Sequence, residues 1–180
     1  MDQKTAKVEP LVGVVIGSDT DLPALVSGLE LLEEWGVPFE VKILSAHRTP
    51  KEAAEFAQTA ADRGLKVIIA AAGMAAHLPG VLAAHTHLPV IGVPIASGEL
   101  RGTDALYSIV QMPPGIPVAC VGINAGRNAA ILAMQILGLT DPVWQDKLDM
   151  YRKKQAEAVL AKSAKLEELG FRAYLSGKQP

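Results

Sequence analysis

The chain has 180 residues, the usual size of a single domain, and its 49% hydrophobic but only 4% aromatic composition calls for a core of aliphatic side chains. The formal net charge of −2 argues against nucleic acid or an anionic membrane as the main partner. No uninterrupted run of about 18 apolar residues occurs, and Met1–Pro10 is polar, so neither a membrane-spanning helix nor a signal peptide is predicted.

Five short apolar segments recur along the chain, each followed by a turn and a helix-like stretch. Four are rich in Val and Ile and carry few charges, as expected for strands buried on both faces; the second alternates more and is expected near an edge. The predicted strands are Val12–Ile16, Phe39–Leu44, Lys66–Ala72, Pro89–Ile95 and Val118–Ile123. The predicted helices between them are Leu22–Trp35, Pro50–Arg63, Ala75 to about Thr86, Thr103–Val110 and Arg127–Leu137.

This alternation, with its short connections, predicts an α/β fold with parallel strands and right-handed crossovers. Five units match a three-layer αβα architecture, a flavodoxin-like doubly wound parallel sheet of order 2-1-3-4-5. An eight-unit barrel requires a longer chain. We assign residues 1–140 to this domain and residues 141–180 to a C-terminal helical extension of it.

The C-terminal extension begins with Asp141, which can cap a helix that has Pro142 at its first position. The predicted helix runs to about Leu169, with an apolar stripe of Trp144, Leu148 and Tyr151. The stripe requires a partner without naming it, so two arrangements stay open. The helix either packs on its own domain or lies as an arm across a neighbouring subunit.

Cys120 is the single cysteine and lies within the last predicted strand. One thiol cannot build a disulfide framework, and we expect it to be buried and unreactive. Together with the absence of a predicted signal peptide, this indicates a cytoplasmic protein. A short, apolar, alanine-rich chain leaves hydrophobic surface for another subunit to cover, so we also expect a homo-oligomer.

Ligands of doubly wound sheets bind beyond the carboxyl ends of the strands, so the loops after the strands are the candidate site. Two of the four histidines and three arginines (Arg48, Arg101 and Arg127) are expected to converge there. His85 and His87 precede the fourth strand, at the opposite edge, and lack carboxylate or Cys neighbours. Neither a metal site nor a cofactor is predicted.

The loop after the first strand offers the hydroxyls of Ser18 and Thr20 beside free amides at a helix start, a favourable place for phosphate. Asp21 can cap this helix or accept hydrogen bonds from ribose hydroxyls. Taken alone, the loop favours plain helix capping. It lacks the Lys of a phosphate-binding P-loop and the glycine spacing of a dinucleotide site.

The second loop contains a more specific pair. Arg48 supplies a fixed fork of donors suited to phosphate, and His47 can gain or lose a proton near neutral pH. A lone histidine is often structural, but its place in the crevice beside an arginine favours a functional role. In the third loop, small residues let backbone amides approach a ligand, Leu78 can exclude water, and His77 either binds a carboxyl group or braces the loop.

Four longer motifs occur in order between about Val12 and Leu137: Gly17-Ser18-x-x-Asp21, Ser45-Ala46-His47-Arg48-Thr49-Pro50, Ala75-Ala76-His77-Leu78-Pro79-Gly80 and Leu106-Tyr107-Ser108-Ile109-Val110-Gln111-Met112-Pro113. Together they resemble the class I N5-carboxyaminoimidazole ribonucleotide mutases, also called catalytic subunits of phosphoribosylaminoimidazole carboxylase. The resemblance implies a flavodoxin-like octamer with sites at subunit boundaries and no metal or organic cofactor. It implies nucleotide binding by Ser18, Asp21 and Arg48 and catalysis by His47.

The expected reaction belongs to purine (IMP) biosynthesis and moves a carboxylate from the exocyclic nitrogen of the aminoimidazole to a ring carbon. His47 would protonate the carbamate nitrogen, the released carbon dioxide would be held beside the ring, and His47 would then remove the ring proton. The predicted substrate-binding residues are Ser18, Thr20, Asp21, Ser45, Arg48, Gly73, Ala75, His77 and Leu78.

Two positions depart from the family pattern, because Met74 stands where a glycine is frequent and Asn124 where a lysine is frequent. Neither touches the expected proton transfer. One alternative is the class II relative that uses free carbon dioxide, which tends to have Lys in place of Arg48 and lacks the His-Leu-Pro-Gly run. The related carboxylase of nickel-pincer cofactor synthesis usually carries a further N-terminal domain. From another class, the chain could be a non-catalytic nucleotide-binding module, which would not need His47.

Overall fold

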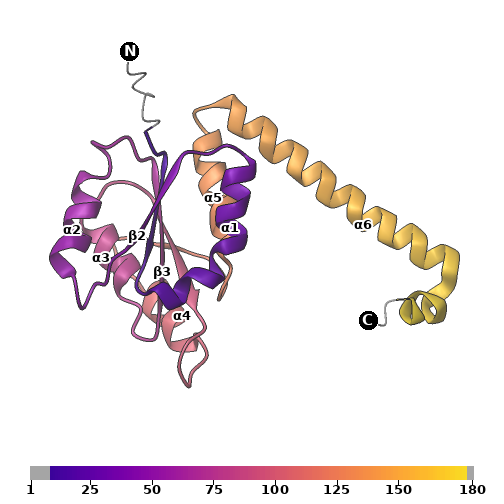
Figure 1. Cartoon of the computed structure of the whole chain (residues 1–180), viewed down its shortest axis with the longest axis horizontal. Coiled ribbons are helices and arrows are strands. Elements are labelled where there is room, and N and C mark those ends of the chain that lie inside the picture. The colour runs from indigo at the N-terminus through magenta and orange to yellow at the C-terminus, as the bar shows by residue number, and fades with distance from the viewer. Residues whose placement is uncertain (1–8, 178–180) are drawn as a thin grey trace, which may run out of the picture.

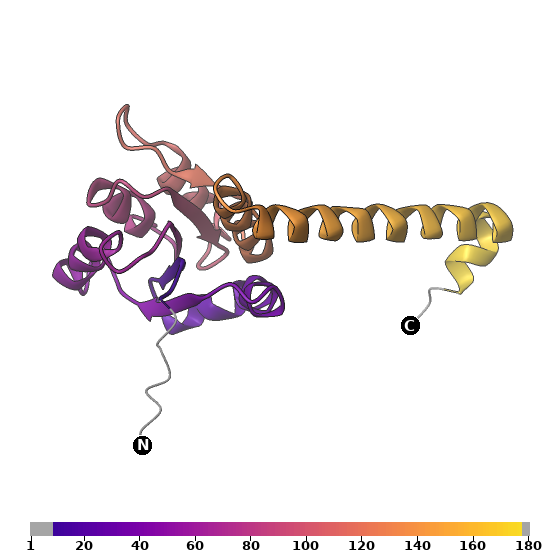
Figure 2. The same cartoon turned by 90° about the horizontal axis from the view of Figure 1, so that it is seen from above.

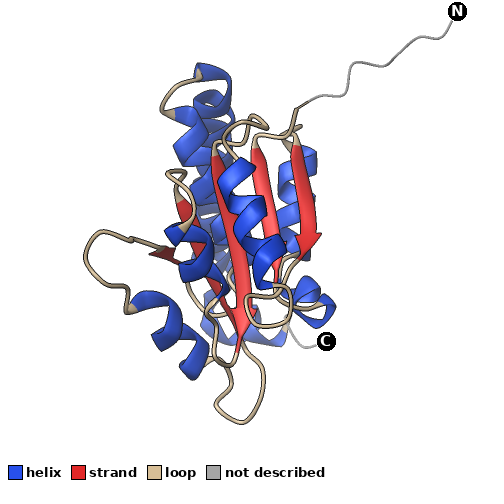
Figure 3. Cartoon of the chain, turned by 90° about the vertical axis from the view of Figure 1, so that its left-hand side faces the viewer, coloured by secondary structure: helices blue, strands red, loops and turns tan. Residues whose placement is uncertain are grey.

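A computed structural model describes residues 9–177. Five parallel strands form one sheet of order β2-β1-β3-β4-β5, which confirms the predicted flavodoxin-like topology (Figure 3). The strands are β1 (Val12–Ile16), β2 (Phe39–Ile43), β3 (Val67–Gly73), β4 (Val90–Ile95) and β5 (Ala119–Cys120). The helices are η1 (Asp19–Ala24, a 3-10 helix), α1 (Val26–Glu34), α2 (Pro50–Thr59), α3 (Leu78–Ala84), α4 (Thr103–Val110), α5 (Gly126–Gly138) and α6 (Pro142–Ser176).

Helices flank both faces of the sheet and give three layers (Figure 1). Two hydrophobic clusters, one on each face of the sheet, hold the layers together. Alternate residues of β1 point to opposite faces, so Val14 packs with α1 and α5 whereas Val15 packs with α2 and α3. The α1–α5 contact is close, because a Cβ added to Gly28 would lie 2.4 Å from the carbonyl oxygen of Gly126. Both faces of the central strands are therefore buried, as their aliphatic composition predicts.

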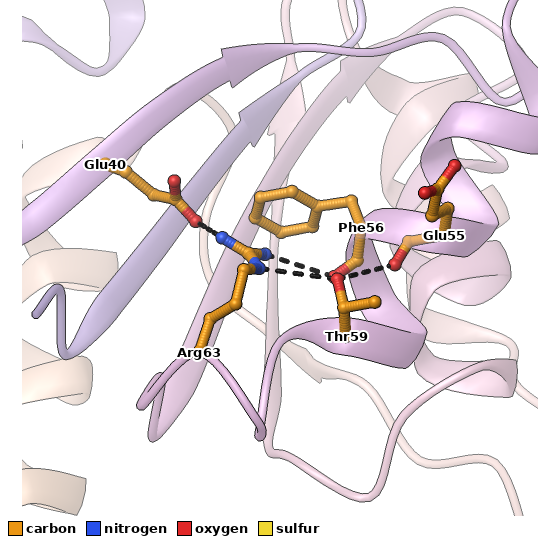
Figure 4. Close-up of polar contacts among 5 residues, drawn as sticks. All are labelled: Glu40, Glu55, Phe56, Thr59 and Arg63. Atoms are coloured by element: carbon orange, nitrogen blue, oxygen red, sulfur yellow. Dashed lines mark hydrogen bonds and ion pairs between the residues drawn. The ribbon is translucent and has the colours of Figure 1, made fainter.

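The edge strand β2 is partly exposed, as its alternating pattern predicts. Arg63, in the turn after α2, ties this edge to the helix (Figure 4). Its guanidinium forms an ion pair with Glu40 of β2, donates to the carbonyl oxygen of Phe56 at 3.2 Å, and lies 4.6 Å from the centre of the Phe56 ring. These contacts hold the edge strand β2 against α2.

The other edge differs from prediction, since β5 has two residues instead of the expected Val118–Ile123. Pro94 of β4 explains the early end. Its carbonyl oxygen accepts from the backbone N–H of Asn124 at 2.8 Å. Proline has no N–H, however, so β4 cannot donate a hydrogen bond to the neighbouring chain segment at this position, and the pairing with β5 ends. Cys120 is consequently only half-buried, not buried as expected, although partial burial raises the pKa of its thiol and keeps it protonated.

The first helix also differs from prediction, because residues 19–24 form η1 before α1 begins at Val26. Pro23 lies inside η1, where it has no N–H to donate to the carbonyl oxygen of Asp19 in an α-helical pattern. Its ring also disfavours the α conformation at Leu22, the predicted start of the helix. The third helix is shorter than expected as well, starting at Leu78 instead of Ala75.

α6 begins as predicted, with Asp141 accepting from the backbone N–H of Val143 at 3.0 Å. Its first turns pack on the body: Leu148 is buried, and the rings of Trp35 and Tyr151 meet edge to face at 5.3 Å. From residue 152 to residue 173 every side chain is exposed, and the helix projects from the body as an arm (Figure 2). The helix extends past the predicted end at residue 169, but Gly170 is non-helical and turns the last segment.

Within the part of the chain that the structure describes, no helix combines the length and apolar character that crossing a bilayer requires. In residues 9–177 no three His, Cys, Asp or Glu side chains converge as a metal-binding group.

Candidate active site

A cavity of about 520 Å³ opens at the carboxyl edge of the sheet, within the size range of small-molecule sites. The loops after β1, β2, β3 and β4 line it, as the rule for doubly wound sheets predicts. Every residue that the sequence predicts to react with or bind the substrate lies in its wall: Ser18, Thr20, Asp21, Ser45, His47, Arg48, Gly73, Ala75, His77 and Leu78. The sequence therefore predicts the location of the cavity, while the contacts of these residues with a ligand stay a prediction.

The loop after β1 is ordered by a capping box. Ser18 Oγ accepts from the backbone N–H of Thr20 at 3.4 Å, and Asp21 Oδ2 accepts from the backbone N–H of Ser18 at 3.1 Å. The helix-capping interpretation is thus correct for this loop. The hydroxyls of Ser18 and Thr20 also bond to each other at 2.9 Å and stay at the accessible wall of the cavity.

Asp21 is the buried acidic residue of the site, only 6% exposed. Loss of water around its carboxylate raises the pKa of Asp21 above the ordinary value of 3.8. The hydrogen bond from the Ser18 amide and the positive charge of Arg48 act in the opposite direction, and Asp19 adds to the increase in pKa. A carboxylate held against its own desolvation at a cavity wall is typical of a functional position.

Ser45 organises the loop after β2. Its hydroxyl accepts from the backbone N–H groups of His47 at 3.4 Å and Arg48 at 3.2 Å. Arg48 Nη2 donates to the carbonyl oxygen of Gly17 at 2.9 Å, which ties this loop to the one after β1. The hydrogen bonds of Arg48 with residues 9–177 use its backbone N–H, Nε and Nη2 but not Nη1, and Arg48 lines the cavity where an anion is expected.

His47 and His77 form a pair that joins the loops after β2 and β3. Nε2 of His47 lies 2.8 Å from Nδ1 of His77, and the two rings meet edge to face at 4.9 Å. One of these facing nitrogens has to donate and the other to accept, so the contact holds one proton between the two rings. From the sequence, His77 could either bind a carboxyl group or brace its loop. The sequence did not predict its direct contact with His47.

The arginine prediction is only partly correct. Arg48 lines the cavity, whereas Arg101 and Arg127 do not. The side chain of Arg127 instead contacts α6 and α1. It donates to Tyr151 Oη at 3.3 Å and to the carbonyl oxygen of Ser27 at 3.3 Å. It helps to fix the start of α6 because the N-terminus of α5 packs directly beside α1 and α6.

Five further residues line the cavity without having been predicted to bind: Gly17, Ala46, Ala72, Met74 and Ser97. Met74 is 60% exposed and has φ = 54°, the left-handed region that glycine adopts readily. Ser97 follows β4 and is half-buried. The position of Ser97 directly after a strand was a usable signal, but an Ala-Ser-Gly turn has the same composition as any surface turn.

The AIRC family pattern, described as AIR carboxylase, matches residues 11–158, which include all five strands and every cavity loop. The chain belongs to the AIR carboxylase family. This confirms the family resemblance indicated by the four sequence motifs.

AIR carboxylase relatives cover nearly the whole chain. The N5-carboxyaminoimidazole ribonucleotide mutase of Synechocystis is 57% identical over 92% of this chain and 94% of its own length. That of Pyrococcus horikoshii is 55% identical over 93% and 95%, respectively. The phosphoribosylaminoimidazole carboxylase of Saccharomyces cerevisiae is 53% identical over 96% of this chain but only 30% of its own length, so the same domain also occurs within a larger protein.

Solved structures of the AIR carboxylase family share the fold. Treponema denticola PurE superposes with a TM-score of 0.78 and 30% identity, covering 87% of this chain and 98% of that one. A single-substitution variant of Treponema denticola PurE2 gives a TM-score of 0.80 and 28% identity, covering 88% and 98%. Both leave out a part of this chain while using nearly all of their own.

Proposed function

We propose that the protein is an N5-carboxyaminoimidazole ribonucleotide mutase of purine biosynthesis. Curated relatives with this name are 51–57% identical over more than 90% of the chain. The structural observation that supports the proposal best is the placement of His47, paired with His77, in the same cavity as Arg48 and Asp21. A proton donor and an anion-binding group then face one small-molecule ligand.

The phosphate and ribose would lie at the loops after β1 and β2, and the base would lie at the loop after β3. Arg48 and the Ser18–Asp21 turn offer donors for the phosphate and an acceptor for ribose hydroxyls. Ser45 holds the Arg48 loop, while Gly73 and Ala75 give the ligand access to backbone amides. The base would then lie beside the His47–His77 pair, with Leu78 limiting the entry of water.

The reaction requires one proton to move in and one to move out. His47 protonates the carbamate nitrogen, and the C–N bond breaks to give carbon dioxide and the aminoimidazole. The ring carbon attacks the retained carbon dioxide, a C–C bond forms, and the same carbon briefly carries both hydrogen and carboxylate. Neutral His47 removes that proton and restores aromaticity. The turnover is proton-neutral and needs neither a metal nor an organic cofactor.

The protein is proposed to act as a cytoplasmic homo-oligomer, an octamer by family resemblance. The exposed arm supports an assembly, because most helices in proteins gain their stability chiefly from tertiary packing. Val159, Leu160 and Leu166 are apolar and 40–67% exposed along it. A second copy of the chain is the partner that would cover them.

The proposal is tested with freshly prepared carbamate substrate at low bicarbonate, detecting the ring-carboxylated product with the next enzyme of the pathway. His47→Asn removes the proton donor and should lower kcat by about 10²- to 10⁴-fold. The variant should still bind the uncarboxylated ribonucleotide. His87→Asn is the matched control, because His87 is exposed and outside the cavity.

Wild-type-like turnover by His47→Asn would falsify the assignment. Product formed only from the uncarboxylated ribonucleotide and carbon dioxide would indicate a direct carboxylase instead. Ribonucleotide binding without conversion in either assay would indicate a nucleotide-binding module.

A further inference from the structure

Ser97 is a polar residue of the cavity wall that the mechanism above does not use. It follows β4, is half-buried and lies in the same wall as His47 and His77. Its hydroxyl makes no hydrogen bond with any residue between 9 and 177. A serine hydroxyl carries one donor and two acceptor positions, so this one is free for a ligand.

The position of Ser97 is fixed from two sides. A Cβ added to Gly73 would lie 2.0 Å from Ser97 Oγ, so the hydroxyl occupies the space that any side chain at 73 would fill. On the other side, Asn124 Oδ1 accepts from the backbone N–H of Ala96 at 2.8 Å. Asn124 is itself held by its N–H, which donates to the carbonyl oxygen of Pro94 at 2.8 Å. The hydroxyl is therefore preorganised rather than carried on a loose turn.

Strand order places Ser97 far from the phosphate-binding side. Arg48 follows β2 at one edge of the sheet, and Ser97 follows β4, three strands further along. At the usual strand spacing this separates the two loops by about 14 Å. The loop after β3, with His77, lies between them, so Ser97 belongs to the end of the cavity where the base and its carboxyl group would lie.

We propose that Ser97 Oγ donates a hydrogen bond to the carboxyl group in transit, both as released carbon dioxide and as the new carboxylate on the ring carbon. This inference rests on the proposed function. Carbon dioxide is neutral and offers a protein little to bind, but negative charge grows on its oxygens as the C–C bond forms. A fixed hydroxyl therefore binds the transition state more strongly than the free gas. Ala72, Met74 and Leu78 line the same cavity and offer apolar surface that would compete poorly for the hydroxyl.

Ser97→Ala is the direct test. We expect kcat/KM to fall by about 10-fold to 100-fold, the usual effect of losing a hydrogen bond to a charged group. A larger share of turnovers should end as uncarboxylated ribonucleotide and free carbon dioxide. Calorimetry should show weaker binding of the carboxylated product but unchanged binding of the uncarboxylated ribonucleotide. Ser27→Ala, an exposed serine on α1 outside the cavity, is the matched control and should equal the wild type.

Equal loss of affinity for both ribonucleotides would overturn the inference, because Ser97 would then contact the shared ribose or phosphate. Wild-type rates and partitioning in Ser97→Ala would overturn it as well. The binding comparison does not depend on turnover. An inactive wild-type enzyme would therefore defeat the proposed function, while the binding difference between the two ribonucleotides would still decide the role of Ser97.

A second variant guards against a folding defect in Ser97→Ala. Gly73→Ala should displace the Ser97 hydroxyl and reproduce the partitioning defect. In the Ser97→Ala background, the added methyl group no longer meets a hydroxyl, and its nearest neighbours are the Cβ of residue 97 at 3.1 Å and the carbonyl oxygen of Ile95 at 3.4 Å. Gly73→Ala should then lower kcat/KM by less than about a further threefold. If the losses in kcat/KM of the two single variants multiply fully in the double variant, the two positions act independently, and Gly73→Ala does not act through the Ser97 hydroxyl.

Discussion

The charge that would let Asp21 bind a ligand lowers the stability of the folded protein. The carboxylate is buried, and burial raises its pKa, yet it is the acceptor that faces the cavity. A raised pKa in the folded state means that Asp21 favours folding most below its ordinary value of 3.8. That contribution is lost as the pH rises from the ordinary value through the raised one.

Asp21→Asn should therefore be at least as stable as the wild type at pH 7, because the amide oxygen can still accept from the Ser18 N–H without a buried charge. Its affinity for the ribonucleotide should fall about tenfold, since hydrogen bonds to a neutral acceptor are weaker. Thermal unfolding between pH 4 and 8 should show the difference in Tm increase with pH and then level off. Asp62→Asn, exposed and outside the cavity, is the control. A variant less stable than the wild type at pH 7 would contradict this account.

Met74 is a second residue with a conformational cost. Its left-handed backbone at φ = 54° disfavours a side chain, and its own side chain is 60% exposed, so little packing is at stake. Met74→Gly should stabilise the protein by about 1 kcal/mol, a Tm increase of roughly 2–4 °C for a chain of this size. Met74→Ala removes the same side chain but keeps the strained conformation, so its Tm should not increase. Equal Tm values for the two variants would show that backbone strain is not the cause.

At the scale of elements, the turn after β4 depends on the turn after β5. Asn124 adopts φ = 56°, which asparagine tolerates better than most residues, and its side chain holds the Ala96 N–H. Asn124→Ala should lower kcat/KM by about 3-fold to 10-fold, because one hydrogen bond is lost and the backbone is strained. Amide hydrogen exchange in residues 96–102 should become faster. Asn128→Ala, exposed on α5, should change neither quantity. Unchanged exchange in Asn124→Ala would remove the proposed coupling of the turns.

Periodicity predicted the elements whose burial follows one simple rule. The strands β1, β3 and β4 are buried on both faces, and their Val- and Ile-rich runs match the structure closely. The prediction was wrong where one residue breaks a run by backbone chemistry. Pro23 makes the first turn 3-10, and Pro94 shortens β5 from the neighbouring strand, a long-range effect that the β5 sequence does not contain.

The candidate site follows the same division. His47 and Arg48 were predicted because their chemistry is rare and their loop follows a strand. The His47–His77 contact and the seat of Ser97 against Gly73 join loops far apart in the sequence, so no local pattern contains them. Arg127 was placed on the correct edge, but its side chain turned to Tyr151.

At the scale of the molecule, one of the two arrangements considered for α6 is realised in part, while the other, an arm across a neighbouring subunit, stays a prediction. The stripe of Trp144, Leu148 and Tyr151 packs on its own domain, whereas the helix beyond residue 152 is solvated. A charge on the apolar side of this arm should oppose assembly without disturbing the body, whose core lies elsewhere.

Val159→Asp combined with Leu166→Asp should therefore lower the native mass measured by light scattering, while the circular dichroism of the body persists. Gln155→Asp adds one aspartate to the arm at a polar position and should leave the mass unchanged. A double variant with the wild-type mass would show that the arm does not hold the subunits together.

The parallel sheet also separates where the chain enters from where a ligand enters. β1 begins at Val12 on the amino edge of the sheet, and the cavity lies at the carboxyl edge. Sequence joined ahead of Val12 is therefore attached on the side of the sheet away from His47. For the same reason, immobilisation through the amino terminus would leave the opening of the cavity facing solution, whereas attachment through Lys51, which follows the His47 loop, would obstruct it.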